Sequence, residues 1–256
     1  MILYSSFQLL LWVMAVLGLI VFISLYFVTA GYGQFRTRQW GPSIDNRVAW
    51  VLMEAPAFLT MLGVWCHAGC PQQLPAVLLF GLFMLHYAQR SFVFPFLMQG
   101  RSQMPVTIML MGVLFNIANG LIQGGGLFWF PNPDYAQGTS YLAEPHTVAG
   151  LLLFATGMGI NLHSDHVIRH LRQPGDTRHY LPQRGMYRYV TSANYLGELL
   201  EWTGFAIAAA TPAAWVFVWW TAANLVPRSH AIHRKYRTEF GDAAVGRRRR
   251  IIPFVY

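Results

Sequence analysis

The stretch SANYLGELLEW, residues 192–202, carries an amide and two carboxylic acids in one of the most apolar parts of the chain. Asn194, Glu198 and Glu201 are spaced i, i+4 and i+7, so on a helix all three side chains lie on one face. Such groups can bind a ligand through hydrogen bonds or carry a proton. A charge at the centre of a bilayer costs about 2.5–3.5 kcal/mol, so two acids on this face indicate a function.

Other apolar segments also carry polar residues on one side. They are Asn116, Asn119 and Gln123 in one segment, Asn161 and Asp165 in another (continued by Arg169 and Arg172), and Glu54, Tyr87 and Arg90 in two more. A single amide can simply join two helices through a hydrogen bond. Four polar faces in one small bundle predict an internal cavity instead.

The two ends of this predicted cavity differ in chemistry. Arg172 and Arg228 stand at one end, whereas Glu54 and Tyr87 stand among aromatic residues at the other. This contrast indicates a phosphate-bearing cofactor and a lipophilic substrate. The glycines at 124–126 and 157–159 lie inside apolar helices without a preceding strand, so they are not a Rossmann fingerprint. We expect glycines such as Gly157 and Gly197 to permit close helix packing.

The elements that must position these residues are transmembrane helices. The chain of 256 residues is 55% hydrophobic and only 11% charged, against about 25% charged in soluble domains. Stretches of about 20 apolar residues can span a bilayer. We predict an all-α integral membrane protein forming a single domain over 1–256, with seven spans at about 7–30, 48–66, 74–97, 105–130, 146–165, 189–210 and 212–226, followed by a tail from Pro227 to Tyr256.

The basic residues predict the topology. Apart from Arg90, they follow spans one, three, five and seven: Arg36, Arg38, Arg47, Arg101, Arg169, Arg172, Arg178, Arg184, Arg188 and the cations of the tail. This alternation places the N-terminus outside and the C-terminus in the cytosol. The net charge of +8 therefore reports topology and does not indicate a nucleic-acid partner. We interpret the run Arg247 to Arg250 as a solvated or lipid-headgroup face.

A metal centre is the less favoured interpretation of the histidines. HSDHVIRH contains His163, His166 and His170, and HAIH contains His230 and His233. Membrane di-iron enzymes need about eight ligands in HxxxH and HxxHH patterns, and HxxHH does not occur in this chain. Cys66 and Cys70, one helical turn apart, are expected to be free thiols. We predict no metal site.

Several long motifs together resemble the steroid 5α-reductases (3-oxo-5α-steroid 4-dehydrogenases). They are GMGINLHSDHVIRHLRQPG (157–175), LPQRGMYRYVTSANYLGELLEW (181–202), LHYAQRSFVF (85–94), GYG (31–33), NGLIQG (119–124) and IIPF (251–254), in order and over nearly the whole chain from about Gly31. The resemblance implies a seven-span membrane fold. It also implies an enzyme that uses NADPH to reduce the Δ4 double bond of 3-oxo-steroids.

The resemblance implies roles for particular residues. Glu54 and Tyr87 correspond to the catalytic residues near the substrate carbonyl. The residues that correspond to cofactor contacts are Tyr32, Asn161, Asp165, Arg172, His179, Asn194, Glu198, Arg228 and Tyr236. Further candidates, for the substrate pocket or with an open role, are Arg90, Arg101, Asn119, Gln123, Glu201 and Trp202. Glu201 either contacts the ligand or joins two helices as a hydrogen-bonded strut.

Three other functions remain open at this point. They are an enoyl reductase of very-long-chain acyl thioesters, an isoprenylcysteine-methyltransferase-like enzyme that uses S-adenosylmethionine, and a non-enzymatic lipid-binding protein. LHYAQR and Glu54 favour the steroid branch. We expect a bacterial member in the inner membrane; a eukaryotic protein of this kind would lie in the endoplasmic reticulum membrane. The expected partners are a lipophilic steroid and the lipid bilayer.

Overall fold

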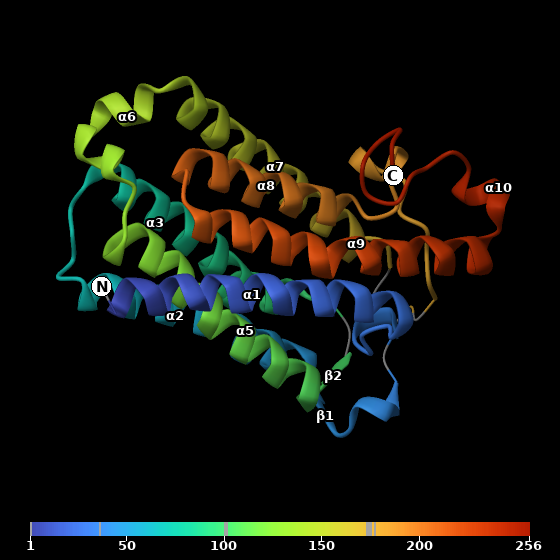
Figure 1. Cartoon of the computed structure of the whole chain (residues 1–256). Coiled ribbons are helices and arrows are strands. Elements are labelled where there is room, and N and C mark those ends of the chain that lie inside the picture. Colours follow the sequence, from blue (N-terminus) through green and yellow to red (C-terminus); the bar gives the residue numbers. More distant parts are fainter. Residues whose placement is uncertain (1, 36, 100–101, 173–175, 177) are drawn as a thin grey trace.

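The computed structural model describes residues 2–35, 37–99, 102–172, 176 and 178–256. The described chain is a bundle of long helices, with its two termini at opposite ends (Figure 1). The α-helices are α1 (Ile2–Phe27), α2 (Asn46–His67), α3 (Leu74–Ala88), α4 (Phe94–Leu97), α5 (Val106–Gly124), α6 (Thr139–Ala143), α7 (Pro145–Arg169), α8 (Ala193–Ala209), α9 (Pro212–Phe240) and α10 (Asp242–Val245). Arg36 and Arg101, for which we made predictions, fall outside the described residues.

Short elements join these helices. The 3-10 turns are η1 (Gly33–Phe35), η2 (Arg38–Trp40), η5 (Pro133–Gln137) and η6 (Gly185–Arg188), and the π-helical turns are η3 (Gln89–Val93) and η4 (Gly125–Trp129). Strands β1 (Ser43–Asp45) and β2 (Gln103–Pro105) pair antiparallel, with Ser43 opposite Pro105. A π-turn widens the helix locally and often marks a functional position. Here η3 carries Arg90, one of the candidate residues.

Five helices are long and apolar enough to cross a membrane, at 3–27, 46–67, 74–97, 106–129 and 145–169. They agree with the first five predicted spans, and the third and fourth continue through η3 and η4. Helices α8 and α9 occupy the positions of the sixth and seventh predicted spans, but α8 has only 17 residues and the second half of α9 is polar. The seven-span count and the orientation of the termini stay predictions.

The C-terminal segment is more ordered than the expected tail. Helix α9 continues through Pro227 to Phe240. The arginine run was expected to be a solvated or headgroup face, and that is only partly right. Arg247 and Arg249 are exposed, but Arg248 donates to the backbone oxygen of Pro182 at 3.1 Å. The backbone N–H groups of Thr191 and Ser192 donate to the oxygens of Arg249 and Arg250, so this segment is docked on the loop before α8.

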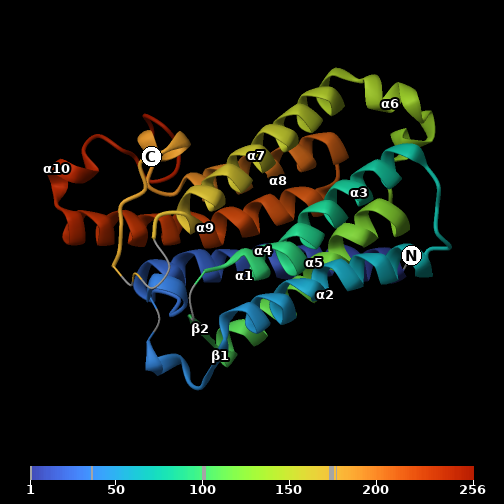
Figure 2. The same cartoon turned by 180° about the vertical axis from the view of Figure 1, so that it is seen from behind.

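Helices α7 and α8 pack backbone against backbone (Figure 2). A Cβ atom added to Gly157 would collide with the backbone of Glu201 and Gly197, and one added to Gly197 would collide with that of Asn161. The pair Gly150 and Gly204 repeats this contact farther along the helices. Small residues allow helices to approach this closely, and the close approach brings the polar faces of α7 and α8 together.

The aromatic core surrounds Trp202, whose ring lies 5.9 Å from Phe83, 5.7 Å from Phe205 and 4.4 Å from Phe217. Helix α1 packs on α9 along one side only (Figure 1). Its outer face exposes large apolar side chains such as Trp12, Ile20 and Phe27. An exposed apolar surface of this length fits contact with lipid.

Candidate functional site

Arg90 stands at the centre of a buried group of acids. Its guanidinium donates to Asp165 at 3.0 Å and lies 3.7 Å from Glu198. The same group lies 4.9 Å from the Trp50 ring and 4.6 Å from the Phe94 ring. The side chains of Arg90 and Asp165 are only 11% and 6% exposed. Because a buried charge needs a partner, these ionic contacts hold η3 against α7 and α8.

A hydrogen-bonded network joins the polar faces of α7 and α8. The Asn161 amide donates to the backbone oxygen of Asn194 at 3.0 Å, and the Asn194 amide donates to Asp165 at 3.3 Å. The Tyr187 hydroxyl donates to the Asn194 side-chain oxygen at 3.3 Å. The glycine contacts described above make these short distances possible. The Asn194 end of the i, i+4, i+7 stripe in SANYLGELLEW therefore faces the stripe on α7.

The Tyr87 hydroxyl lies beside α5. The amide of Asn119 donates to it at 2.9 Å, and both side chains are buried. The other side-chain atom of Asn119, Oδ1, is buried and has no hydrogen-bond partner among the described residues. An unpaired buried oxygen is costly, so this position suits a donor supplied by a ligand or water.

Glu54 approaches the same region from α2. Asn116 donates to Glu54 Oε2 at 3.3 Å and to the backbone oxygen of Met53 at 2.7 Å. Glu54 is close enough to Arg90 and Glu198 for their charges to interact. It is also close enough to Tyr87 for an electrostatic interaction with the hydroxyl group. The two candidate catalytic side chains thus belong to one electrostatic neighbourhood, on two helices.

His86 and Glu201 form a buried pair next to this neighbourhood. Nδ1 of His86 lies 2.7 Å from Oε1 of Glu201, and the His86 ring lies 4.6 Å from Trp202. Glu201 is thus a strut between α3 and α8, which is one of the two roles considered for it. Its second oxygen, Oε2, is buried without a partner among the described residues, as is Nε1 of Trp202. The Glu201 oxygen can still accept a hydrogen bond from a ligand or water, and the Trp202 indole N–H can still donate one.

Arg228 organises the other end of the bundle. It donates to the Tyr195 hydroxyl at 2.8 Å and to the backbone oxygen of Tyr32 at 3.2 Å. Its guanidinium lies 3.7 Å from the Tyr32 ring. Arg228 therefore fastens the loop after α1 onto α8 and α9. It also places two tyrosine rings and one cation together at the basic end.

The remaining candidates lie at the outer rim of the basic end. Burial and the Glu239 carboxylate raise the pKa of Tyr236 to about 12, and the Arg172 guanidinium opposes that shift. Tyr236 therefore keeps its proton at neutral pH. His179 Nδ1 lies 2.6 Å from Oε1 of Glu239, and Arg172 is exposed.

The structure brings together most of the residues predicted from the sequence. One group contains Glu54, Tyr87, Arg90, Asn119, Asn161, Asp165, Asn194, Glu198, Glu201 and Trp202. At the basic end, Tyr32 contacts Arg228, whereas Arg172, His179 and Tyr236 lie around Glu239. Gln123 is different, because its amide donates to the backbone oxygen of Ala213 at 2.9 Å and joins α5 to the start of α9. Arg101 lies outside the described residues.

Sequence reasoning did not select every residue of the site. His86 and Tyr195 contact candidate residues but were not chosen, and Asn116 was placed on a polar face of the predicted cavity without a role in the site. His86 and Tyr195 lie inside LHYAQR and SANYLGELLEW, so their place in these motifs was the available signal. Among the described residues, no group of three or more His, Cys, Asp or Glu side chains could hold a metal ion. Cys66 and Cys70 are free, as predicted.

The fold and the site define an integral membrane protein whose apolar helices enclose a network of polar and ionised side chains. Residues 102–256 match the family model for 3-oxo-5-alpha-steroid 4-dehydrogenase. The chain is 38% identical over 245 residues to 3-oxo-5-alpha-steroid 4-dehydrogenase 2 of Sus scrofa, covering 91% of each protein. It is 35% identical over 230 residues to 3-oxo-5-alpha-steroid 4-dehydrogenase 1 of Bos taurus, covering 88% of each.

A human relative gives the same result. The chain is 36% identical over 233 residues to 3-oxo-5-alpha-steroid 4-dehydrogenase 2 of Homo sapiens, covering 89% of this chain and 88% of that protein. The chain therefore belongs to the 3-oxo-5-alpha-steroid 4-dehydrogenase family and is an oxidoreductase. This membership confirms the resemblance identified from the motifs.

Proposed function

We propose that this protein reduces the Δ4 double bond of 3-oxo-Δ4-steroids to give 5α-steroids, with NADPH as the reductant. The relatives that this chain matches over about nine-tenths of their length are named 3-oxo-5-alpha-steroid 4-dehydrogenases. The observation that carries the proposal within the molecule is the Tyr87 hydroxyl, buried among aromatic rings and hydrogen-bonded to Asn119 at 2.9 Å. A fixed hydroxyl in an apolar site suits recognition of a ketone on a lipophilic molecule.

Tyr87 is the residue that polarises the C3 carbonyl of the substrate. During the reduction of an enone, negative charge develops on the carbonyl oxygen. A preorganised donor near that oxygen stabilises the transition state more than the ground state. Since Asn119 donates to the Tyr87 oxygen, the tyrosine proton is left free to be donated to the substrate. Glu54, in its protonated form, is the second donor.

The residues at the basic end fit a phosphate-bearing dinucleotide. Arg172 is exposed, Arg228 lies between aromatic rings, and Tyr236 keeps its proton, so cations and hydrogen-bond donors are available there. Asn161, Asp165, Asn194 and Glu198 lie in the polar network of α7 and α8 and would hold the nicotinamide half. When bound, NADPH supplies the hydride that is transferred to C5 of the steroid.

The ionic group around Arg90 holds the proposed cofactor residues of α7 and α8 in position. The positive charge of Arg90 offsets part of the negative charge of Asp165 and Glu198, which would otherwise repel each other and the phosphates of a cofactor. Because η3, which directly continues α3, contacts both α7 and α8 through this group, the group fixes the distance between the Tyr87 region and the proposed cofactor residues. The aromatic rings around Trp202 exclude water from the reacting atoms.

One assay tests the proposed reaction. The detergent-purified protein is given NADPH with testosterone or progesterone, and the loss of cofactor absorbance is followed. We expect NADPH oxidation and a product with 5α ring-junction stereochemistry. No NADPH oxidation with any 3-oxo-Δ4-steroid would contradict the proposal. Oxidation only with a 2-enoyl thioester would reassign the protein to the enoyl reductases.

A further inference from the structure

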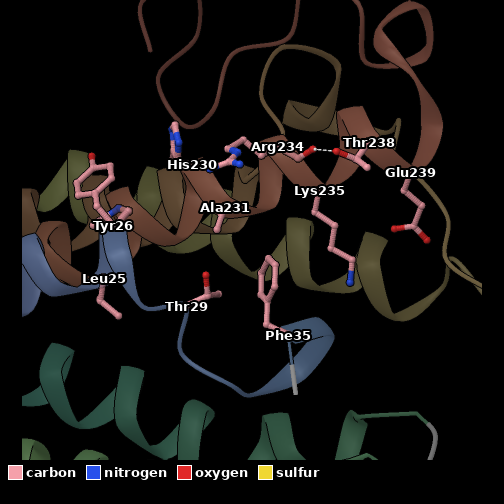
Figure 3. A pocket seen from close by; sticks show the side chains of 11 residues that line it. Leu25, Tyr26, Thr29, Phe35, His230, Ala231, Arg234, Lys235, Thr238 and Glu239 are labelled. Carbon is pink, nitrogen blue, oxygen red and sulfur yellow. Dashed lines mark hydrogen bonds between the residues drawn. The ribbon is translucent and has the colours of Figure 1, made fainter. Parts of the chain in front are cut away.

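A groove lies outside the proposed active site, between the end of α1, η1 and the second half of α9. It has a volume of about 480 Å³ (Figure 3). Leu25, Tyr26 and Phe35 form its apolar side, and Arg234 and Lys235 belong to its α9 side. Phe35 and Lys235 lie next to each other in the middle of the view. The groove therefore combines an apolar surface with two cations.

The charge of this groove is positive. Lys235 donates to the backbone oxygen of Gln34 at 2.7 Å and lies 5.2 Å from the Phe35 ring. Among the described residues, no acid forms a salt bridge with Arg234 or Lys235. The acid of the groove lining, Glu239, is already paired with His179 at 2.6 Å. The groove thus offers two cations that lack an anionic partner.

His230 adds no charge of its own. Burial, Arg250 and Arg234 lower the pKa of His230, so the imidazole is neutral at neutral pH. Arg250 lies beyond the groove lining, 4.6 Å from the Tyr256 ring. An anion in the groove would therefore meet Arg234 and Lys235 first, with Arg250 as a more distant cation. The shape and the charges suit one monoanionic or dianionic group.

The position of the groove indicates where that anion comes from. Helix α1 exposes apolar side chains along its length, including Ile23 and Phe27 near its end, and Val28 directly after it is exposed as well. The helix ends at Phe27, and the chain then turns into η1. The groove begins at this boundary, where a surface suited to lipid tails meets the polar end of the bundle. If α1 crosses the bilayer, the headgroups of its lipids lie at the level of this boundary.

We propose that this groove binds the headgroup of an anionic phospholipid. The phosphate lies against Arg234 and Lys235, and the acyl chains follow the exposed apolar face of α1. The aromatic rings of Tyr26 and Phe35 border the glycerol region, because amphipathic and aromatic residues favour the membrane interface. This site is independent of the proposed reductase activity and needs no residue assigned to steroid or cofactor binding.

Native mass spectrometry on the full chain in an uncharged detergent tests the proposal. Phosphatidylglycerol and phosphatidylcholine are titrated separately, and the bound lipid is counted. We expect tighter binding of phosphatidylglycerol. Each cation near an anionic lipid contributes about 1 kcal/mol, so Arg234→Gln should weaken phosphatidylglycerol binding about fivefold. The double variant Arg234→Gln, Lys235→Gln should weaken it further.

The matched control is Arg247→Gln, which removes the same charge from an exposed residue outside the groove. This variant should bind phosphatidylglycerol like the wild type. An equal loss in both variants would show attraction to net charge alone and overturn the proposal, as would equal affinity for the two lipids. A thermal unfolding curve of Arg234→Gln establishes that the variant is folded.

Two further measurements exclude other anions. Inorganic phosphate at the lipid concentrations used should not displace phosphatidylglycerol; full displacement would assign the groove to a free anion. NADPH should also leave bound phosphatidylglycerol in place, and Arg234→Gln should leave NADPH affinity unchanged. Displacement by NADPH, together with a loss of NADPH affinity in that variant, would assign the groove to the cofactor and overturn the proposal.

Discussion

Nδ1 of His86 lies 2.7 Å from Oε1 of Glu201, and neither residue has more than 6% of its surface exposed. The two residues come from α3 and α8 and are 115 positions apart. Each precedes a residue of the aromatic core, since Tyr87 follows His86 and Trp202 follows Glu201. The pair thus fixes the helix that carries Tyr87 against the helix that carries Asn194 and Glu198.

The first prediction concerns this pair. Glu201→Ala leaves His86 without its partner, and breaking a buried ionic pair costs about 3–5 kcal/mol. Glu201→Gln keeps an oxygen that can accept from His86, so it should retain most of the stability. Thermal unfolding in detergent compares the two variants with the wild type. An unchanged unfolding temperature for Glu201→Ala would mean that the pair does not hold α3 to α8.

The second prediction concerns the Tyr87 hydroxyl. Tyr87→Phe should lower kcat by about 100-fold or more, because removal of one donor to a developing oxyanion has this effect. NADPH affinity should stay the same. Turnover within about twofold of the wild type, well under 1 kcal/mol, would remove Tyr87 from the proposed role.

A second tyrosine serves as the control for Tyr87. Tyr135 is also buried and lies on η5, which carries none of the candidate residues. Its hydroxyl donates to the backbone oxygen of Ala209 at 2.6 Å. Tyr135→Phe should lower the stability by about 0.5–1.5 kcal/mol, the usual net contribution of one hydrogen bond. Its kcat should stay close to the wild-type value. The comparison separates the loss of a hydroxyl group from the loss of the catalytic donor.

The third prediction concerns the cofactor. Arg172→Ala and Asn194→Ala should each raise the Kd for NADPH about tenfold, which corresponds to about 1.4 kcal/mol. Intrinsic NADPH fluorescence on titration measures this without any steroid. Arg188→Ala, at another exposed arginine of the same loop region, is the control and should leave the Kd unchanged. Wild-type affinity in both test variants would exclude these two residues from the cofactor site.

The fourth prediction separates the geometry of Arg90 from its charge. The guanidinium contacts two acids and two aromatic rings at once. A lysine ammonium at this position keeps the charge but lacks the planar fork, so Arg90→Lys should cost about 1–3 kcal/mol in unfolding free energy. Thermal unfolding measures the loss. Full stability in Arg90→Lys would show that charge alone is sufficient there.

The fifth prediction concerns the contact between α7 and α8. A Cβ atom at Gly157 would enter the backbone of α8, whereas one at Gly159 would meet nothing within 4 Å. Gly157→Ala should therefore destabilise the protein by about 1–3 kcal/mol. Gly159→Ala should be neutral or stabilising by up to about 1 kcal/mol, because alanine favours helix. If both variants unfolded at the same temperature, the close packing of α7 and α8 would not explain why residue 157 is a glycine.

Local patterns in the sequence were enough for several features. Apolar runs of about 20 residues predicted the five helices that are long and apolar enough to cross a membrane, because helix length and bilayer thickness are matched. The spacing of Asn194, Glu198 and Glu201 predicted a common face, because the helical repeat is fixed. The long motifs predicted the family, which the comparison with known relatives confirms. Each of these features depends on residues that are close together in the chain.

The partners of the polar residues depended on the tertiary structure. Nothing in the sequence indicates that Arg90 binds Asp165, 75 positions away, or that Gln123 joins Ala213 while Asn119 contacts Tyr87. Nor could the pattern decide between a ligand contact and a strut for Glu201. A helical repeat fixes which residues share a face, but the neighbour of that face is selected by long-range packing, here by the glycine contacts of α7 and α8.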